Sequence, residues 1–102
     1  MLYLKLQSSL TTAVNGQSLA GLIIAALHTE EAVQVDFADV EVLTPSFANA
    51  LILTLLASMS VESLRVRCVM TNRRDTVADS LNRAAFRFQQ GIRLSDQLPA
   101  HV

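Results

Sequence analysis

The stretch Val33-Gln-Val-Asp-Phe-Ala-Asp-Val-Glu-Val-Leu-Thr-Pro-Ser-Phe-Ala48 decides the fold class, because it passes from a strand into a helix. Apolar residues at positions 33, 35 and 37 alternate with polar ones, which is the period of a strand with one buried face. A short acidic loop follows. Thr44 is then typical of a helix N-cap, and Pro45 is typical of the first helical position. We therefore expect a strand that ends near Phe37 and a helix over residues 45–59.

Two other runs, Leu2-Tyr-Leu-Lys-Leu6 and Leu64-Arg-Val-Arg-Cys-Val-Met70, also alternate. A sheet with helices on both faces would show continuous apolar strands instead, so the alternation predicts helices on one face only. The other face of the sheet should be open to water. The residues expected on this open face are Tyr3, Lys5, Gln34, Asp36, Arg65 and Arg67.

The segments between the strands have the period of helices. Apolar residues from Leu19 to Leu27 predict a first helix, with Asn15-Gly16 as a turn before it and Ser18 as its N-cap. A third helix is expected over residues 74–90, ending at Gly91. It should bury Val77, Leu81, Ala84, Ala85 and Phe88. Residues 10–14 fit either a second strand or the start of the first helix, and we favour the strand.

This order of elements predicts an α/β fold, a two-layer sandwich with a four-stranded (or three-stranded) mixed sheet and about three helices on one face. A chain of 102 residues is one domain in length. We expect residues 1–90 to form that domain and residues 91–102 to form a C-terminal tail. Residues 1–51 carry one basic and five acidic side chains, a net charge of −4, whereas residues 52–102 carry seven and four, a net charge of +3. Such asymmetry can orient a partner.

Several classes of function are disfavoured by what the chain lacks. A single cysteine, Cys68, excludes an internal disulfide and a cysteine-based zinc site, and we expect its side chain to be buried and inert. His28 and His101 have no second ligand at helical spacing, and no glycine-rich phosphate loop is present. We expect no metal, no cofactor and no catalysis. The absence of a signal sequence and of a membrane-length apolar run predicts a cytoplasmic protein that binds no membrane.

The second helix offers a candidate surface. Its apolar residues cover one broad face, and the opposite face keeps a narrow strip of small or apolar residues that suits close approach by another chain. Asp39 and Glu41 supply a charged rim beside this strip. The predicted partner-binding residues are Asp39, Glu41, Thr44, Ser46, Asn49, Ala50, Leu53 and Ala57. Phe86 of the third helix is also expected to be exposed.

The opening stretch resembles the corresponding junction of the STAS superfamily, the anti-sigma-factor-antagonist fold, and it looks closer still to the bacterial STAS-like domain of unknown function. Asp36-Phe37, Val40 and Leu43 match the strand end, the loop and the residue before the helix. Ser46 falls on the serine that is phosphorylated in the superfamily. The superfamily's preceding Asp and Ser and its following Gly are replaced by Thr44, Pro45 and Phe47. The resemblance covers residues 2–90.

This resemblance implies a non-catalytic regulatory module in bacterial signalling, which binds a protein partner such as an ATPase- or kinase-type regulator. Phosphorylation at Ser46, near the start of the second helix, is the implied means of control. The alternative is a small-ligand-binding or enzymatic subunit that uses Asp36, Asp39 and Ser46. Nucleic-acid binding is not expected, because Asp79 and Arg83 are spaced to form an ion pair within the third helix, and the expected open sheet face carries no stacking aromatic residue except Tyr3. A homodimer remains open.

Overall fold

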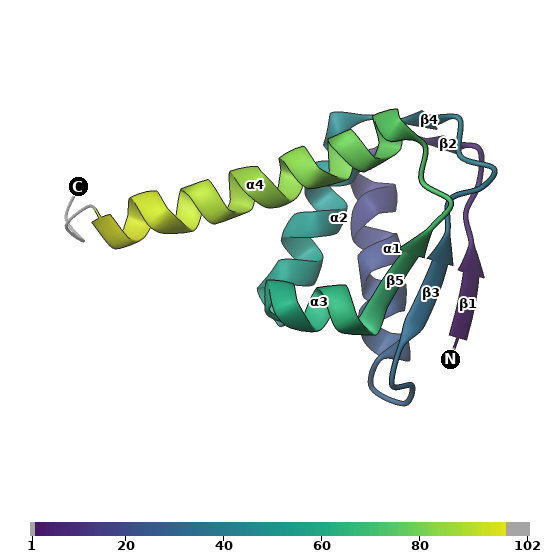
Figure 1. The fold of residues 1–102 in the computed structure, drawn as a ribbon, viewed down its shortest axis with the longest axis horizontal. Coiled ribbons are helices and arrows are strands. Elements are labelled where there is room, and N and C mark those ends of the chain that lie inside the picture. The colour runs from purple at the N-terminus through teal and green to yellow at the C-terminus, as the bar shows by residue number, and fades with distance from the viewer. Residues whose placement is uncertain (1, 98–102) are drawn as a thin grey trace.

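Three parallel strands form a sheet that carries the helices on one face, as the computed structural model of the chain shows (Figure 1). The structure describes residues 2–97, and it describes side chains through Phe88. The order of elements is β1 (Leu2–Lys5), β2 (Ser9–Leu10), α1 (Ala13–Ala26), β3 (Val33–Asp36), β4 (Val42–Leu43), α2 (Pro45–Ser58), α3 (Val61–Arg67), β5 (Cys68–Thr71) and α4 (Asp75–Gln97).

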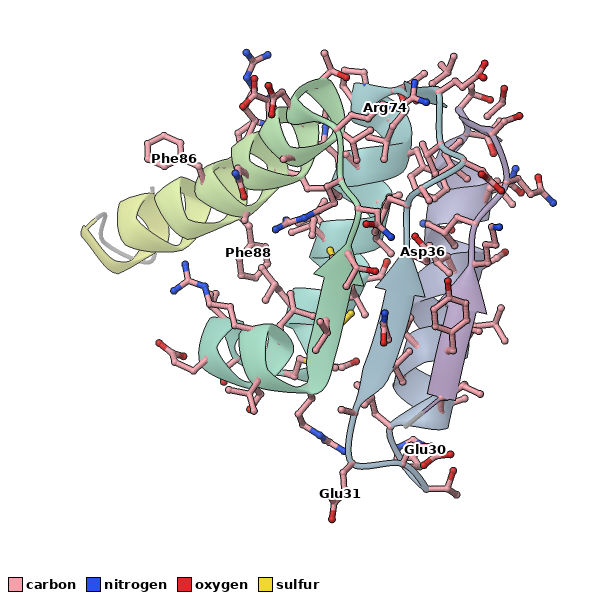
Figure 2. All side chains as sticks on the ribbon, turned by 45° about the vertical axis from the view of Figure 1, so that its right-hand side comes forward. Glu30, Glu31, Asp36, Arg74, Phe86 and Phe88 are labelled. Atoms are coloured by element: carbon pink, nitrogen blue, oxygen red, sulfur yellow. The ribbon has the colours of Figure 1, made fainter. Side chains whose placement is uncertain are left out.

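The strand order is β1-β3-β5, and both ladders are parallel. Tyr3, Gln34 and Val69 lie in one row of the open face. Lys5, Asp36 and Thr71 lie in the next row. Figure 2 shows this face in front of the helices. The prediction was therefore right for Tyr3, Lys5, Gln34 and Asp36.

A second sheet pairs β2 with β4, also in parallel. The expected single mixed sheet is thus wrong, because β2 leaves β1 and joins the segment just before α2. Of residues 10–14, only Leu10 belongs to a strand, and α1 begins at Ala13. Thr12 caps α1 by accepting a hydrogen bond from the backbone N–H of Asn15 at 3.1 Å. Ser18 is therefore not the N-cap.

Gly16 lies inside α1, where it allows the helix to approach α2, and it is not part of a turn. A Cβ on this residue would lie 2.6 Å from the carbonyl oxygen of Phe47 and 3.0 Å from the Cβ of Ala50. Real side chains do not tolerate such distances to backbone atoms, so α1 and α2 pack this closely only because residue 16 is glycine.

The run over residues 64–70 contains the largest error of the sequence interpretation. Its first half belongs to α3, and the strand begins only at Cys68. The Ser60 side chain caps α3 by accepting a hydrogen bond from the N–H of Ser63 at 3.1 Å. A serine at this position indicates the start of a helix, but the alternating residues that follow favoured a strand. Consequently Arg65 and Arg67 are absent from the open sheet face, where Val69 and Thr71 take their places.

Helix α4 is longer than expected, since it continues through Gly91 to Gln97. Glycine in a helix costs only about 1 kcal/mol, which flanking residues can offset. The predicted tail is therefore helical over residues 91–97, and residues 98–102 lie outside the described part. Val77, Leu81 and Ala84 are buried as expected, whereas Ala85 and Phe88 are half-buried. In Figure 1 the second half of α4 extends beyond the other helices.

The core lies between the sheet and α1, α2 and the first half of α4. Phe37, Phe47, Val35 and Val40 are fully buried there. Cys68 is 5% exposed, and burial raises the pKa of its thiol to about 11, so the prediction of a buried cysteine was right.

Candidate partner-binding surface

The start of α2 is fixed as the sequence predicted. The Thr44 hydroxyl accepts a hydrogen bond from the N–H of Phe47 at 3.3 Å, and it donates one to the carbonyl of Thr11 at 2.7 Å. Pro45 occupies the first turn, where its missing N–H leaves no hydrogen bond unmade. Ser46 is exposed in this turn. The hydroxyl is accessible, and it lies at the helix end whose dipole favours negative charge.

The strip residues of α2 are not equally exposed, because α1 packs beside some of them. Leu53, which is 50% exposed, and Ala57 lie on the outer surface. Ala50 is half-buried beside α1, because a Cβ built on Gly16 would lie 3.0 Å from its Cβ. Ala50 is therefore less accessible to a partner than Leu53 and Ala57, which are exposed.

Helix α4 borders the remaining strip residues and contributes to the site. Arg87 donates a hydrogen bond from its guanidinium to the side-chain oxygen of Asn49 at 2.8 Å. Beside this contact lies a pocket of about 250 Å³ between the two helices. Its lining residues are Asn49, Leu53, Ala84, Arg87 and Phe88.

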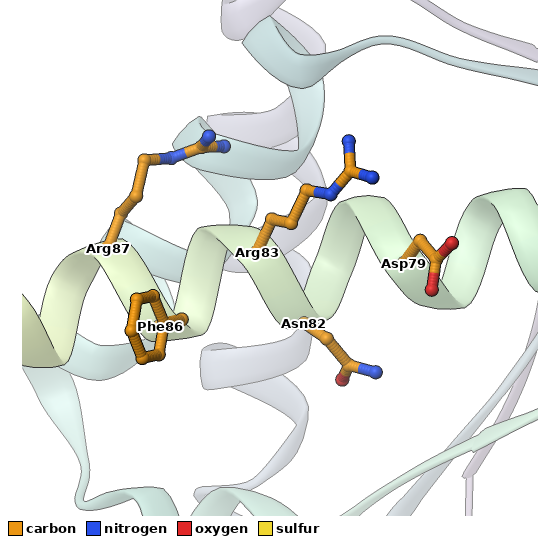
Figure 3. A pocket seen from close by; sticks show the side chains of 5 residues that line it. All are labelled: Asp79, Asn82, Arg83, Phe86 and Arg87. Atoms are coloured by element: carbon orange, nitrogen blue, oxygen red, sulfur yellow. The ribbon is translucent and has the colours of Figure 1, made fainter.

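A second depression lies on α4 itself and shares Arg87 with the pocket beside Leu53 (Figure 3). Arg83 and Arg87 extend side by side from one side of the helix, and the Phe86 ring lies on the surface of the helix that faces the viewer. Phe86 is 59% exposed, as the sequence predicted. Because one helix alone lines this depression, it is a shallow surface feature, whereas the pocket beside Leu53 is formed between two helices.

Of the two acidic residues expected as a rim, Asp39 lies toward the sheet. Asp39 forms an ion pair with Lys5 of β1, with 3.2 Å between Nζ and Oδ2. In Figure 1, β1 is the sheet edge farthest from α4. Glu41 is exposed, and its backbone N–H donates to the carbonyl of Ser8. Asp39 therefore belongs to the sheet side of the molecule and not to the Leu53 pocket.

Asp36 lies on the open sheet face but is only 6% exposed. One carboxylate oxygen accepts from the Tyr3 hydroxyl, and the other accepts from the N–H of Ala38 and the amide of Asn72, both at 2.9 Å. These hydrogen bonds, that of Tyr3 first, hold the pKa of Asp36 below its ordinary value. The same bond raises the pKa of Tyr3. Asn72 has a φ of 58°, a left-handed conformation that asparagine tolerates.

The contribution of α4 to this site was missed by the sequence interpretation. Period and burial identified Phe88 only as a core residue, and Arg87 only as one basic residue among several. The spacing of Ala84, Arg87 and Phe88 at i, i+3 and i+4 was the available signal, because such residues share one helix face. The spacing of residues within α4 could not show that α2 crosses this face of the helix.

The structure is that of a small α/β domain with its helices on one side of a parallel sheet. A family model for the STAS-like domain of unknown function (DUF4325) matches residues 15–78, from the first turn of α1 to the start of α4. The chain belongs to this family, which confirms the resemblance found in the sequence. No curated protein and no solved structure matches the chain.

Two negative findings apply to the described part of the chain. No single helix there is long and apolar enough to cross a membrane, and α2 and α3 reach that length only as a pair bent by 105°. Within the same residues, no three His, Cys, Asp or Glu side chains gather as ligands for a metal ion.

Proposed function

We propose that this domain is a non-catalytic regulatory module that binds a protein partner through the outer surface of α2 and the adjoining face of α4. The pocket beside Leu53 carries the proposal, because protein interfaces bury an apolar centre within a polar rim, and here an exposed apolar side chain adjoins a concave site bordered by Arg87. The partner class we propose, from the resemblance of the sequence to the STAS superfamily, is an ATPase- or kinase-type regulator. The setting we propose is signalling in the bacterial cytoplasm.

Ser46 is the proposed point of control. It is exposed in the first turn of α2, whereas Asn49 and Leu53 follow on the same helix at the pocket. A phosphate on Ser46 would add about −1.5 to −2 charge at the edge of the interface. Helix-end attraction would retain the phosphate, and any acidic group of the partner would be repelled.

The alternative of a ligand-binding or catalytic cluster gains no support from the geometry. Asp36 is engaged by three donors of the protein itself, and Asp39 is paired with Lys5. Neither carboxylate has a described contact with Ser46. A protein interface therefore remains the function that the arrangement supports best.

The test compares two leucines that are similarly exposed on different helices. Leu53→Asp should abolish partner binding, because a carboxylate buried without a partner in an interface costs several kcal/mol. Leu22→Asp is the matched control, since Leu22 is 60% exposed on α1. Crosslinking in native lysate with wild type and both variants identifies the candidate partner, and calorimetry with the purified partner then measures affinity.

Ser46→Asp should weaken the same association by a smaller factor than Leu53→Asp. Circular dichroism melting should show all three variants folded. If the purified partner binds Leu53→Asp as tightly as wild type, the proposed surface is wrong. If only Ser46→Asp is without effect, the surface stands and the control by phosphorylation is wrong.

A further inference from the structure

The chemistry of the partner can be read from two arginines of α4. Arg87 lines both the pocket beside Leu53 and the depression around Phe86, and Arg83 lines the latter one turn earlier. Both residues are exposed. Their guanidinium groups extend from the same side of the helix (Figure 3). The pocket beside Leu53 is therefore bordered by the positive charge of Arg87, and Arg83 adds a second positive charge one turn before it on the same side of α4.

Within the described part of the chain, neither guanidinium has a carboxylate at ion-pair distance. The single hydrogen bond described for Arg87 goes to the neutral side chain of Asn49. Asp79 stands four residues before Arg83, at a spacing that often forms an ion pair. In Figure 3, however, the Asp79 carboxylate points away from the two guanidinium groups. The charges of Arg83 and Arg87 are thus available to another molecule.

The size of the pocket limits what fits beside these charges. A volume of about 250 Å³ lies below the range of roughly 300–1,000 Å³ that is usual for small-molecule sites. It suits one apolar side chain of a protein partner, in the way that interface anchors fill pockets. Phe88 and Leu53 supply apolar walls, and Arg87 supplies the charged border.

A neutral or basic partner would be disfavoured at this place. Covering Arg87 without a carboxylate removes water from a guanidinium and offers nothing in return, which costs free energy. A carboxylate placed there would form a charge-assisted hydrogen bond, bidentate where the geometry allows it. Complementary charge would also steer the encounter, so the arginines should determine which partner binds.

We propose that the occupant of the α2–α4 surface is an acidic protein segment that inserts one apolar side chain beside Leu53 and places carboxylates on Arg83 and Arg87. This inference rests on the proposed function, because it names the chemistry of the partner at the same surface. A second copy of the chain, bound through its own acidic residues, would be a different occupant, and the experiments below distinguish it from an acidic partner.

The probe is a phage-displayed library of random peptides, selected on the wild-type domain and depleted on Leu53→Asp. Peptides that survive both steps bind at the pocket. They should carry an apolar residue flanked by Asp or Glu. Their affinity should fall about tenfold or more in the double variant Arg83→Glu/Arg87→Glu. It should also fall when the ionic strength rises from about 0.05 M to about 0.5 M.

The matched control is Arg65→Glu/Arg73→Glu, which makes the same charge change at two exposed arginines on α3 and ahead of α4. These peptides should bind this variant as they bind wild type. A peptide with Lys in place of its acidic residues should bind the Arg83→Glu/Arg87→Glu variant better than it binds wild type, which shows that the variant keeps its surface.

Neutral or basic peptides among the selected binders, or equal losses in both double variants, would overturn the acidic partner and leave the Leu53 surface intact. The proposed function itself fails separately, when the purified natural partner binds Leu53→Asp with wild-type affinity. Sedimentation equilibrium of the wild type gives the third outcome. A dimer that dissociates in Arg83→Glu/Arg87→Glu, but not in the control, would make a second copy the occupant and overturn the proposal.

Discussion

Two glycines of the same helix have opposite roles. Gly16 is buried against α2, where a Cβ would meet the carbonyl oxygen of Phe47 at 2.6 Å. Gly21 is exposed on the other side of α1, and a Cβ there would meet nothing within 4 Å. Replacing each glycine by alanine adds the same methyl group. At Gly21 the change affects only helix propensity, whereas at Gly16 it also affects the packing of α1 on α2.

We expect Gly21→Ala to raise the free energy of unfolding by about 0.5–1 kcal/mol, because alanine restricts the unfolded chain and favours the helix. Gly16→Ala gains the same propensity but forces α1 away from α2. Its net effect should be a loss of about 1–3 kcal/mol. Urea denaturation of both variants measures the difference. Equal stabilisation by the two substitutions would show that α1 and α2 do not pack this closely.

At the scale of elements, α3 shows how one residue fixes a connection. Arg67 ends this helix and reaches three backbone carbonyls at the turn between α1 and β3. Its guanidinium donates to the oxygens of Leu27, Glu30 and Glu31, at 2.6, 3.2 and 3.1 Å. These carbonyls lie after the last turn of α1, where backbone acceptors are left without helical partners. Arg67 thus ties α3 to the loop that leads into the central strand.

Arg67→Met should lower the free energy of unfolding by about 1–3 kcal/mol, since it removes a charged donor and leaves these carbonyls unsatisfied. Arg65→Met is the control, because Arg65 is exposed and has no hydrogen bond among the described residues. Urea denaturation of the two variants provides the measurement. A loss that is equal in both would mean that the contacts of Arg67 contribute nothing specific.

The elements also show what the sequence could and could not predict. Thr44 and Pro45 placed the start of α2 correctly, because a cap is a local interaction between residues three apart. Residues 64–70 were misassigned, because Leu64, Cys68 and Met70 have helix and strand spacings at once, and only the Ser60 cap decides between them.

Leu53 was correctly expected to be exposed, since it faces away from the apolar side of its own helix. Arg87 was missed, because its contact with Asn49 joins residues that are distant in the sequence.

For the whole molecule, Asp36 joins three separate parts of the chain. Its carboxylate binds β1 through Tyr3, its own loop through Ala38, and the segment before α4 through Asn72. These bonds lower the pKa of Asp36 from its ordinary value of 3.8. Because the carboxylate is favoured in the folded state, its contribution is complete above that value and is lost as the pH falls through the lowered pKa. The raised pKa of Tyr3 has the opposite sign, so its contribution is lost as the pH rises beyond its ordinary value of 10.0.

Tyr3→Phe should therefore lower the free energy of unfolding most between pH 3.8 and pH 10.0, the ordinary pKa values of Asp36 and Tyr3. Below and above this range, the stability of the variant should change less with pH than that of the wild type. Urea denaturation of wild type and variant across the acid and alkaline ranges measures this profile. Asp36→Asn provides the complementary profile, with the acid decline reduced because no carboxylate remains to be protonated. Parallel profiles for Tyr3→Phe and wild type would show that the two side chains do not interact in solution.

The register of the sheet has a consequence for how the chain acquires its structure during synthesis. Leu2 pairs with Val33, and Val33 pairs with Cys68, so every ladder of the main sheet joins residues that are far apart in the sequence. Such pairings form slowly, because a long loop must close before any contact is gained. On the ribosome, β1 would wait until β3 emerges, and β3 would wait in turn for β5. During that interval the unpaired edges of β1 and β3 are exposed to other chains, and for β3 the interval lasts until β5 has been synthesised.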